Sequence, residues 1–244
     1  MSFTLAHPAA VVFMKNKYFN LSGLILGSMA PDFIYFILFN PSSNFGHTIL
    51  GFMLLNIPLC FLLNFIYYKY IKDSFILNLP MCISKDYTWL IDIKNGVTNV
   101  KEAVIFTYSS VIGMMTHVFW DSFTHKTGYF VLKLNFLRDN INLLGHKIYI
   151  YKIAQHGGTL LGFVIILIFL HKIRKRGLIL KVPLRSKVMY HVTAVLIEII
   201  LMFFIYITFN DSFSMGRIVV TFINGLFLGY LISSIMYKNT FIYS

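Results

Sequence analysis

Six long apolar stretches constrain the fold of this chain more than any other feature of its sequence. They cover residues 21–39, 48–68, 103–123, 158–171, 189–209 and 218–237. A helix needs about 20 apolar residues to cross a bilayer, and hydrocarbon admits only backbones that satisfy their own hydrogen bonds. The fourth stretch is short unless it begins near Ile153, and residues 3–14 are too few to span. We expect an all-α, polytopic transmembrane bundle of five to six spans, preceded by a short half-membrane or interfacial helix.

The composition agrees with a membrane protein and changes the meaning of the net charge. Hydrophobic residues make up 57% of the chain and charged residues 12%, whereas a soluble domain carries about 25% charged residues. A net charge of +12 would suggest a nucleic-acid partner in a soluble protein. In a membrane protein, basic residues mark cytoplasmic loops and contact anionic lipid headgroups. We therefore expect membrane lipids as partners and no nucleic acid.

The basic residues orient the chain and divide it into three regions. Residues 172–188 form the most densely basic segment, and the positive-inside rule places it in the cytoplasm. Its cations are Lys172, Arg174, Lys175, Arg176, Lys181, Arg185 and Lys187. The segment 126–152 argues against this orientation, because its own basic residues then lie outside. We expect residues 1–171 to be a membrane-embedded domain and residues 189–244 to be a C-terminal transmembrane hairpin.

A polar stripe interrupts the third apolar stretch. His117, Asp121 and His125 are spaced four residues apart, so they share one face of a helix. Ionisable groups at membrane depth are costly and are functional candidates, and zinc, manganese and iron accept His and Asp as ligands. The two histidines lie about 12 Å apart along the helix axis, too far to share one ion easily. Asp121 is therefore placed to bridge two ions, one held with His117 and a second with His125.

Four further polar residues lie within the apolar stretches or at their ends. His7 precedes a proline, Asp32 follows one, His47 opens the second stretch, and His156 precedes two glycines near the fourth. With residues 172–188 in the cytoplasm, all four can approach His117 in the outer half of the membrane. The alternative for each histidine is a helix cap or an interface residue, whereas a buried carboxylate such as Asp32 needs a partner.

Five short motifs occur in order within residues 1–162. They are FTLAHPAA at 3–10, GSMAPDF at 27–33, HTILG at 47–51, THVFWDSFTH at 116–125 and QHG at 155–157. Together they resemble a bacterial integral membrane family of unknown function, domain of unknown function 4184. The second, third and fourth are distantly similar to membrane-bound metal-dependent hydrolases of bacterial inner membranes. That resemblance implies metal binding and a multi-pass inner-membrane location, although Asn44-Phe45-Gly46 replaces the basic stretch that usually precedes the second motif's histidine.

These observations predict a membrane-embedded, metal-dependent hydrolase that acts on a lipid or lipid-linked ester, with a phosphoester favoured. The expected cofactor is a divalent transition metal, zinc being favoured and manganese or iron being alternatives. The expected metal ligands are His7, Asp32, His47, His117, Asp121, His125 and His156, with Asp32 and Asp121 also expected to be catalytic.

Two other functions fit the same residues. The first is a non-catalytic metal-binding protein or transporter, for which Glu198 and His191 are the sequence's hint of a polar path toward the cytoplasmic side. The second is a structural membrane protein whose polar cluster fastens helices together.

Overall fold

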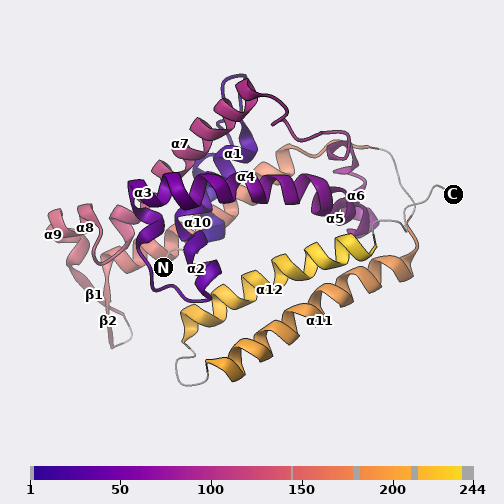
Figure 1. The fold of residues 1–244 in the computed structure, drawn as a ribbon. Helices are drawn as coiled ribbons and strands as arrows, with labels where there is room; N and C mark the ends of the chain where they lie inside the picture. Colours follow the sequence, from indigo (N-terminus) through magenta and orange to yellow (C-terminus); the bar gives the residue numbers. More distant parts are fainter. Residues whose placement is uncertain (1–2, 144, 178–181, 210–213, 238–244) are drawn as a thin grey trace. The chain divides into compact units, whose positions relative to one another are not determined.

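The computed structural model describes residues 3–143, 145–177, 182–209 and 214–237, and its helices are labelled in Figure 1. Six helical segments of the described chain are long and apolar enough to cross a membrane. They are Leu21–Leu38, Ile49–Asn78, Val100–Lys133, Ile150–Lys172, Leu184–Thr208 and Met215–Met236. The all-α, polytopic fold is therefore confirmed. The fourth span begins at Ile150 and not at residue 158, so it is long enough to cross a bilayer. The apolar stretch in the sequence was shorter because the first turns of this helix contain polar residues.

The chain forms two compact units, and the first contains residues 1–33, 44–61 and 96–173. Its N-terminal part is built from η1 (Thr4–Ala10), α1 (Leu21–Met29), η2 (Ala30–Asp32), η3 (Phe45–His47), α3 (Ile49–Gly51) and η4 (Phe52–Asn56). Its C-terminal part is built from α7 (Val100–Thr124), α8 (Tyr129–Lys133), α9 (Asn135–Arg138), the antiparallel strands β1 (Asn140–Leu143) and β2 (His146–Tyr149), and α10 (Ile150–Lys172).

Helices α1 and α7 of this unit lie close together because small residues face each other across their contact. A Cβ atom on Gly27 of α1 would overlap the backbone of Ser110 on α7. Small residues at such contacts let membrane helices approach closely, so backbone groups come within reach of side chains on the neighbouring helix. Asn20 caps the start of α1 by accepting a hydrogen bond from the Gly23 N–H at 2.9 Å. This packing fixes the end of α1 beside the polar residues of α7.

The second unit contains residues 34–43, 62–95 and 174–244. Its elements include most of α2 (Phe33–Leu38), η5 (Tyr67–Ile71), α5 (Lys72–Asn78), α6 (Met81–Ser84), η6 (Thr88–Leu90), α11 (Leu184–Thr208) and α12 (Met215–Met236), while α4 (Ile57–Ile66) spans the boundary between the two units.

Helices α11 and α12 run side by side as a hairpin (Figure 1). Gly225 of α12 faces the buried Glu198 of α11. Asn224 of α12 donates a hydrogen bond to the Phe36 carbonyl at 2.7 Å.

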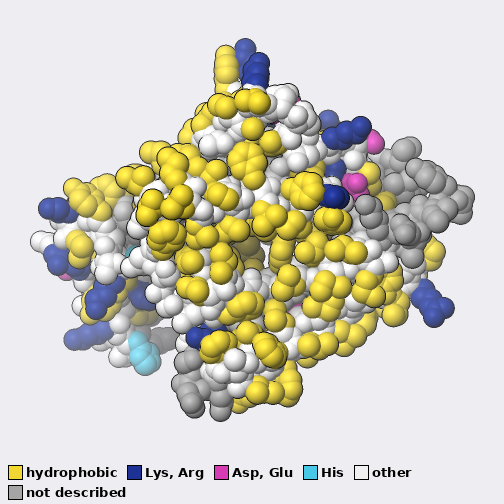
Figure 2. All heavy atoms as spheres, in the orientation of Figure 1, with side chains coloured by type: hydrophobic (Ala, Val, Ile, Leu, Met, Phe, Trp, Pro, Cys, Tyr) yellow, Lys and Arg dark blue, Asp and Glu magenta, His cyan; other side chains and the backbone are white. Residues whose placement is uncertain are grey.

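The surface is mostly apolar, as expected for helices that contact lipid. Figure 2 shows many exposed hydrophobic side chains and comparatively few Asp and Glu side chains. Ile49, Leu54 and Val100 are examples of large apolar side chains that stay exposed on the spanning segments. In water this surface would be unfavourable, so a membrane is the environment that accounts for it.

Candidate metal centre

Five polar side chains from four segments of the first unit meet in a small volume. They are His7 of η1, Asp32 of η2, His47 of η3, and His117 and Asp121 of α7. They form two overlapping trios, in each of which the possible ligand atoms lie within 4.8 Å of one another. The first trio is His7, His117 and Asp121, and the second is Asp32, His47 and His117. The two trios share His117, which is therefore the centre of the cluster.

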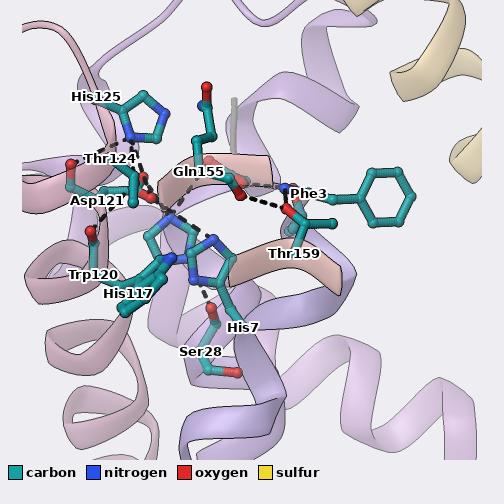
Figure 3. A network of polar contacts seen from close by, with 12 residues as sticks. Phe3, His7, Ser28, His117, Trp120, Asp121, Thr124, His125, Gln155 and Thr159 are labelled. Atoms are coloured by element: carbon teal, nitrogen blue, oxygen red, sulfur yellow. Dashed lines mark hydrogen bonds and ion pairs between the residues drawn. The ribbon is translucent and has the colours of Figure 1, made fainter. Parts of the chain in front are cut away.

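His117 is fully buried, and its tautomer follows from one contact. Its Nδ1 lies 2.7 Å from the backbone carbonyl of Ser28 on α1, as Figure 3 shows. A carbonyl only accepts hydrogen bonds, so Nδ1 carries the proton. In the neutral ring, Nε2 then presents a lone pair, and it has no hydrogen-bond partner among the described residues. Metal-bound histidines characteristically donate their second ring N–H in this way.

The lone pair of His117 points toward two carboxylates. Its Nε2 lies 3.2 Å from Oδ2 of Asp121 and 3.6 Å from Oδ1 of Asp32. A neutral imidazole nitrogen and ionised carboxylate oxygens are all hydrogen-bond acceptors. This arrangement is unfavourable unless a proton or a metal cation lies between the groups.

Asp32 is held so that only one of its oxygens faces the cluster. The Thr4 hydroxyl donates a hydrogen bond to Oδ2 of Asp32 at 2.5 Å. The other oxygen, Oδ1, lies 3.8 Å from Nε2 of His47 and also faces His117. Pro31 lies in the first turn of η2 and pre-sets the backbone there, so the carboxylate is positioned by both its backbone and its second oxygen.

Asp121 connects the two trios. Its Oδ2 faces His117 and lies 3.7 Å from Nε2 of His47. Its Oδ1 lies 3.8 Å from Nε2 of His7 and 3.3 Å from Nδ1 of His125. The carboxylate thus has different histidines on its two oxygens, which is the arrangement that a bridging ligand needs.

The distances and charges fit a bound divalent cation. Two atoms that each lie about 2.0–2.2 Å from a tetrahedral zinc ion are roughly 3.3–3.6 Å apart. The five contacts between nitrogen and oxygen atoms of the two trios measure 3.2 to 3.8 Å, and most are too long for hydrogen bonds. Two ionised carboxylates with three neutral imidazoles carry a formal charge of −2, which one divalent ion neutralises.

His7 is suited to this role because it stays neutral. Burial, together with the neighbouring His117 ring, lowers the pKa of His7 from its usual 6.5 to about 3. The two rings are stacked, with centroids 3.8 Å apart. A neutral imidazole is the form that binds a metal.

Three residues that were not among the predicted site residues position the side chains of the cluster. Thr4 holds Asp32, the Ser28 carbonyl orients His117, and the buried Asn56 donates a hydrogen bond to the Gly46 carbonyl at 2.8 Å, which fixes the turn that carries His47. Asn56 ends the π-helical turn η4, and such turns are frequent at functional sites. A polar side chain within the apolar stretch 48–68 was the signal for Asn56, whereas nothing local distinguishes Thr4.

The other predicted ligands lie differently. His125 lies 3.3 Å from Asp121 but belongs to neither trio. His156 lies on α10 with an exposed side chain, and neither trio includes it. Gln155, the residue before His156, is buried, so the two side chains lie on different faces of the helix. The structure thus brings five of the seven predicted ligands together, with His125 at the edge and His156 outside.

The comparison with known proteins gives a family and no named relative. No curated protein and no solved structure matches the chain. The family model described as a domain of unknown function, DUF4184, matches residues 1–235, a range that includes every residue of the cluster. The chain therefore belongs to the DUF4184 family.

Proposed function

We propose that this protein is a membrane-embedded, metal-dependent hydrolase that cleaves a lipid or lipid-linked ester, with a phosphoester favoured, in a bacterial inner membrane. The observation that carries the proposal is the convergence of the His117 Nε2 lone pair and two carboxylates in a buried space, where a cation resolves an otherwise repulsive arrangement. Zinc is the favoured ion, and manganese and iron bind the same ligand types.

Each residue of the cluster has a definable task. His117, His47 and Asp32 would hold an ion on one side, and His7 with Asp121 would hold an ion on the other or complete a single site. A bound divalent ion lowers the pKa of a coordinated water and polarises a phosphoryl or acyl oxygen. Asp32 and Asp121 are the candidates to accept the proton of that water, because they are the carboxylates of the cluster.

The side chains of the cluster differ in their exposure to solvent. The side chain of His117 is 0% exposed, whereas those of His47 and His125 are 22% and 30% exposed. A substrate would therefore approach from the side of these two histidines. His7 also lines an apolar groove, which supports a lipid over a water-soluble ester.

A transporter is less well supported. The sequence hinted at a polar path through Glu198 and His191. Of these two, His191 makes structural contacts: its Nε2 lies 3.1 Å from the Asn78 carbonyl and its Nδ1 lies 3.2 Å from the Tyr230 hydroxyl. Both ring nitrogens are therefore engaged within the second unit, and His191 has no free atom for a moving ion.

Metal analysis with an activity assay tests the proposal. Protein purified in detergent without chelators should contain about one or more transition-metal ions per chain. After reconstitution, it should release phosphate from phosphatidic acid or a headgroup from phosphatidylglycerol, and Asp121→Asn should abolish the release while His171→Ala leaves it unchanged. Wild-type protein with well under one metal per chain would refute both the hydrolase and the transporter, leaving a polar cluster that fastens helices.

A further inference from the structure

An apolar groove runs along the first unit beside the candidate metal centre. It is bounded by η1, α7 and α10 and has a volume of about 680 Å³, within the range of ligand pockets. None of the described residues that line it is Asp, Glu, Lys or Arg. Its walls include Ala9 of η1, Met115 and Trp120 of α7, and Gly158 and Ile165 of α10.

Close packing of η1 on α10 shapes the groove. Gly162 of α10 faces Ala6, and a Cβ atom at Gly162 would lie 2.8 Å from the Ala6 carbonyl oxygen. At the next turn, a Cβ atom on Gly158 would overlap the ring of Trp120. Small residues therefore let the short η1 helix lie directly against α10. Ala9 and Trp120 line the groove that remains between the elements.

The hydroxyl groups of the two threonines that line the groove are already engaged. Thr159 accepts a hydrogen bond from the Phe3 N–H and donates one to the Gln155 carbonyl at 3.0 Å, as Figure 3 shows. Thr116 donates to the Gly113 carbonyl at 2.7 Å. Both hydroxyl groups are therefore taken up within the protein, whereas His7 contributes to the groove wall and to the candidate metal cluster alike.

We propose that this groove binds one hydrocarbon chain of a membrane lipid, with the polar end of that lipid beside His7. The walls of α7 and α10 belong to spanning helices, so the medium that meets the groove is lipid hydrocarbon. An extended peptide would leave its backbone groups unsatisfied there, because the threonine hydroxyls are engaged. The location of the cleaved ester at the metal centre rests on the proposed function; the binding of the chain does not.

Photolabelling tests the proposal. Wild-type protein is reconstituted in phosphatidylcholine vesicles that contain a small fraction of phosphatidylcholine with a diazirine on one acyl chain. After irradiation, labelled peptides are mapped by mass spectrometry. We expect label on the groove residues Ala9, Met115 and Ile165 at a yield several-fold higher than on Leu167, an exposed residue of α10 outside the groove, because a chain held in the groove stays beside the same residues.

Substitutions distinguish a lipid chain bound in the groove from lipid that contacts the outer surface of the helices. Ala9→Trp should fill the groove and lower labelling of Met115 and Ile165 about tenfold, equivalent to ~1.4 kcal/mol of lost binding. Ala9→Leu should reduce the labelling of Met115 and Ile165 by a smaller factor. This smaller substitution keeps the test valid if Ala9→Trp does not fold. Leu167→Trp changes an exposed residue of α10 that does not line the groove, so it should leave the labelling of Met115 and Ile165 unchanged.

Two labelling outcomes overturn the inference. The first is labelling of Leu167 and the groove residues in equal proportion, and the second is labelling that Ala9→Trp leaves unchanged in folded protein. Metal content measured on the same samples keeps the two proposals apart. Metal without groove labelling refutes the bound chain alone, whereas groove labelling without metal refutes the hydrolase and supports the bound chain.

Discussion

At the scale of single residues, Asp121 lies close to histidines on both of its carboxylate oxygens. Its two oxygens face His117 and His47 on one side and His7 and His125 on the other. His125 lies 3.3 Å from Oδ1 of Asp121 and belongs to neither trio. The two residues are neighbours on α7, yet their removal should have unequal effects.

Asp121→Ala should therefore remove more metal than His125→Ala. It should also lower the free energy of unfolding by about 1–3 kcal/mol, because buried histidines lose their charged partner. His171→Ala, on an exposed residue at the end of α10, should change neither quantity. Bound zinc, manganese and iron are measured by mass spectrometry and unfolding by thermal denaturation in detergent. Equal metal loss in the Asp121 and His125 variants would contradict the bridging arrangement.

The lowered pKa of His7 predicts that the stability of the folded protein depends on pH. Its pKa is about 3 in the folded protein and about 6.5 when unfolded, so between these values the unfolded chain binds a proton that the folded chain excludes. Stability from this residue is therefore constant above about pH 6.5 and falls as the pH decreases toward 3.

The stability difference between wild type and His7→Asn should accordingly shift in favour of the variant as the pH is lowered, since Asn does not titrate. Thermal unfolding in detergent at several pH values from about 7.5 to 5 measures this. Curves for the two proteins that stay parallel over that range would show that His7 is protonated equally in the folded and unfolded states.

At the scale of secondary-structure elements, the contact between α1 and α7 orients the central histidine. Ser28 lies one residue from Gly27 on α1, and its carbonyl receives the hydrogen bond from His117. Because Gly27 lies against the backbone of Ser110, the spacing of the two helices and the orientation of the imidazole are set together.

Gly27→Ala should separate the two helices and thereby disturb His117, although Gly27 does not belong to the cluster. We expect a loss of about 1–3 kcal/mol in stability and a several-fold lower metal content. Gly157→Ala is the matched control, because nothing lies within 4 Å of a Cβ atom at that exposed helical position; it should be neutral or stabilising by up to ~1 kcal/mol. Normal metal content in a folded Gly27→Ala protein would show that His117 does not depend on this contact.

At the scale of the whole molecule, the orientation in the membrane is a prediction of the sequence. If residues 172–188 are cytoplasmic, a cysteine introduced at Asn210 should react with an impermeant thiol reagent in intact cells, whereas one at Lys181 should not. Both positions lie outside the described residues. The background should lack Cys82, which is exposed, while the buried Cys60 can stay. The reverse labelling pattern would place the metal centre on the cytoplasmic side.

The sequence by itself determined the six spans and the pairing of His117 with Asp121. Apolar length decides whether a segment enters a bilayer, and the helical repeat decides which residues share a face. Both are local properties, so they can be read without the fold.

Tertiary structure alone decided which of the remaining polar residues join the cluster. His7, Asp32 and His47 come from three separate 3₁₀ turns, and their approach depends on how η1, α1 and α7 pack. His156 has a similar sequence setting but lies exposed on α10. The direction of a side chain at a helix end follows from packing between helices that are distant in sequence, and no local pattern specifies that packing.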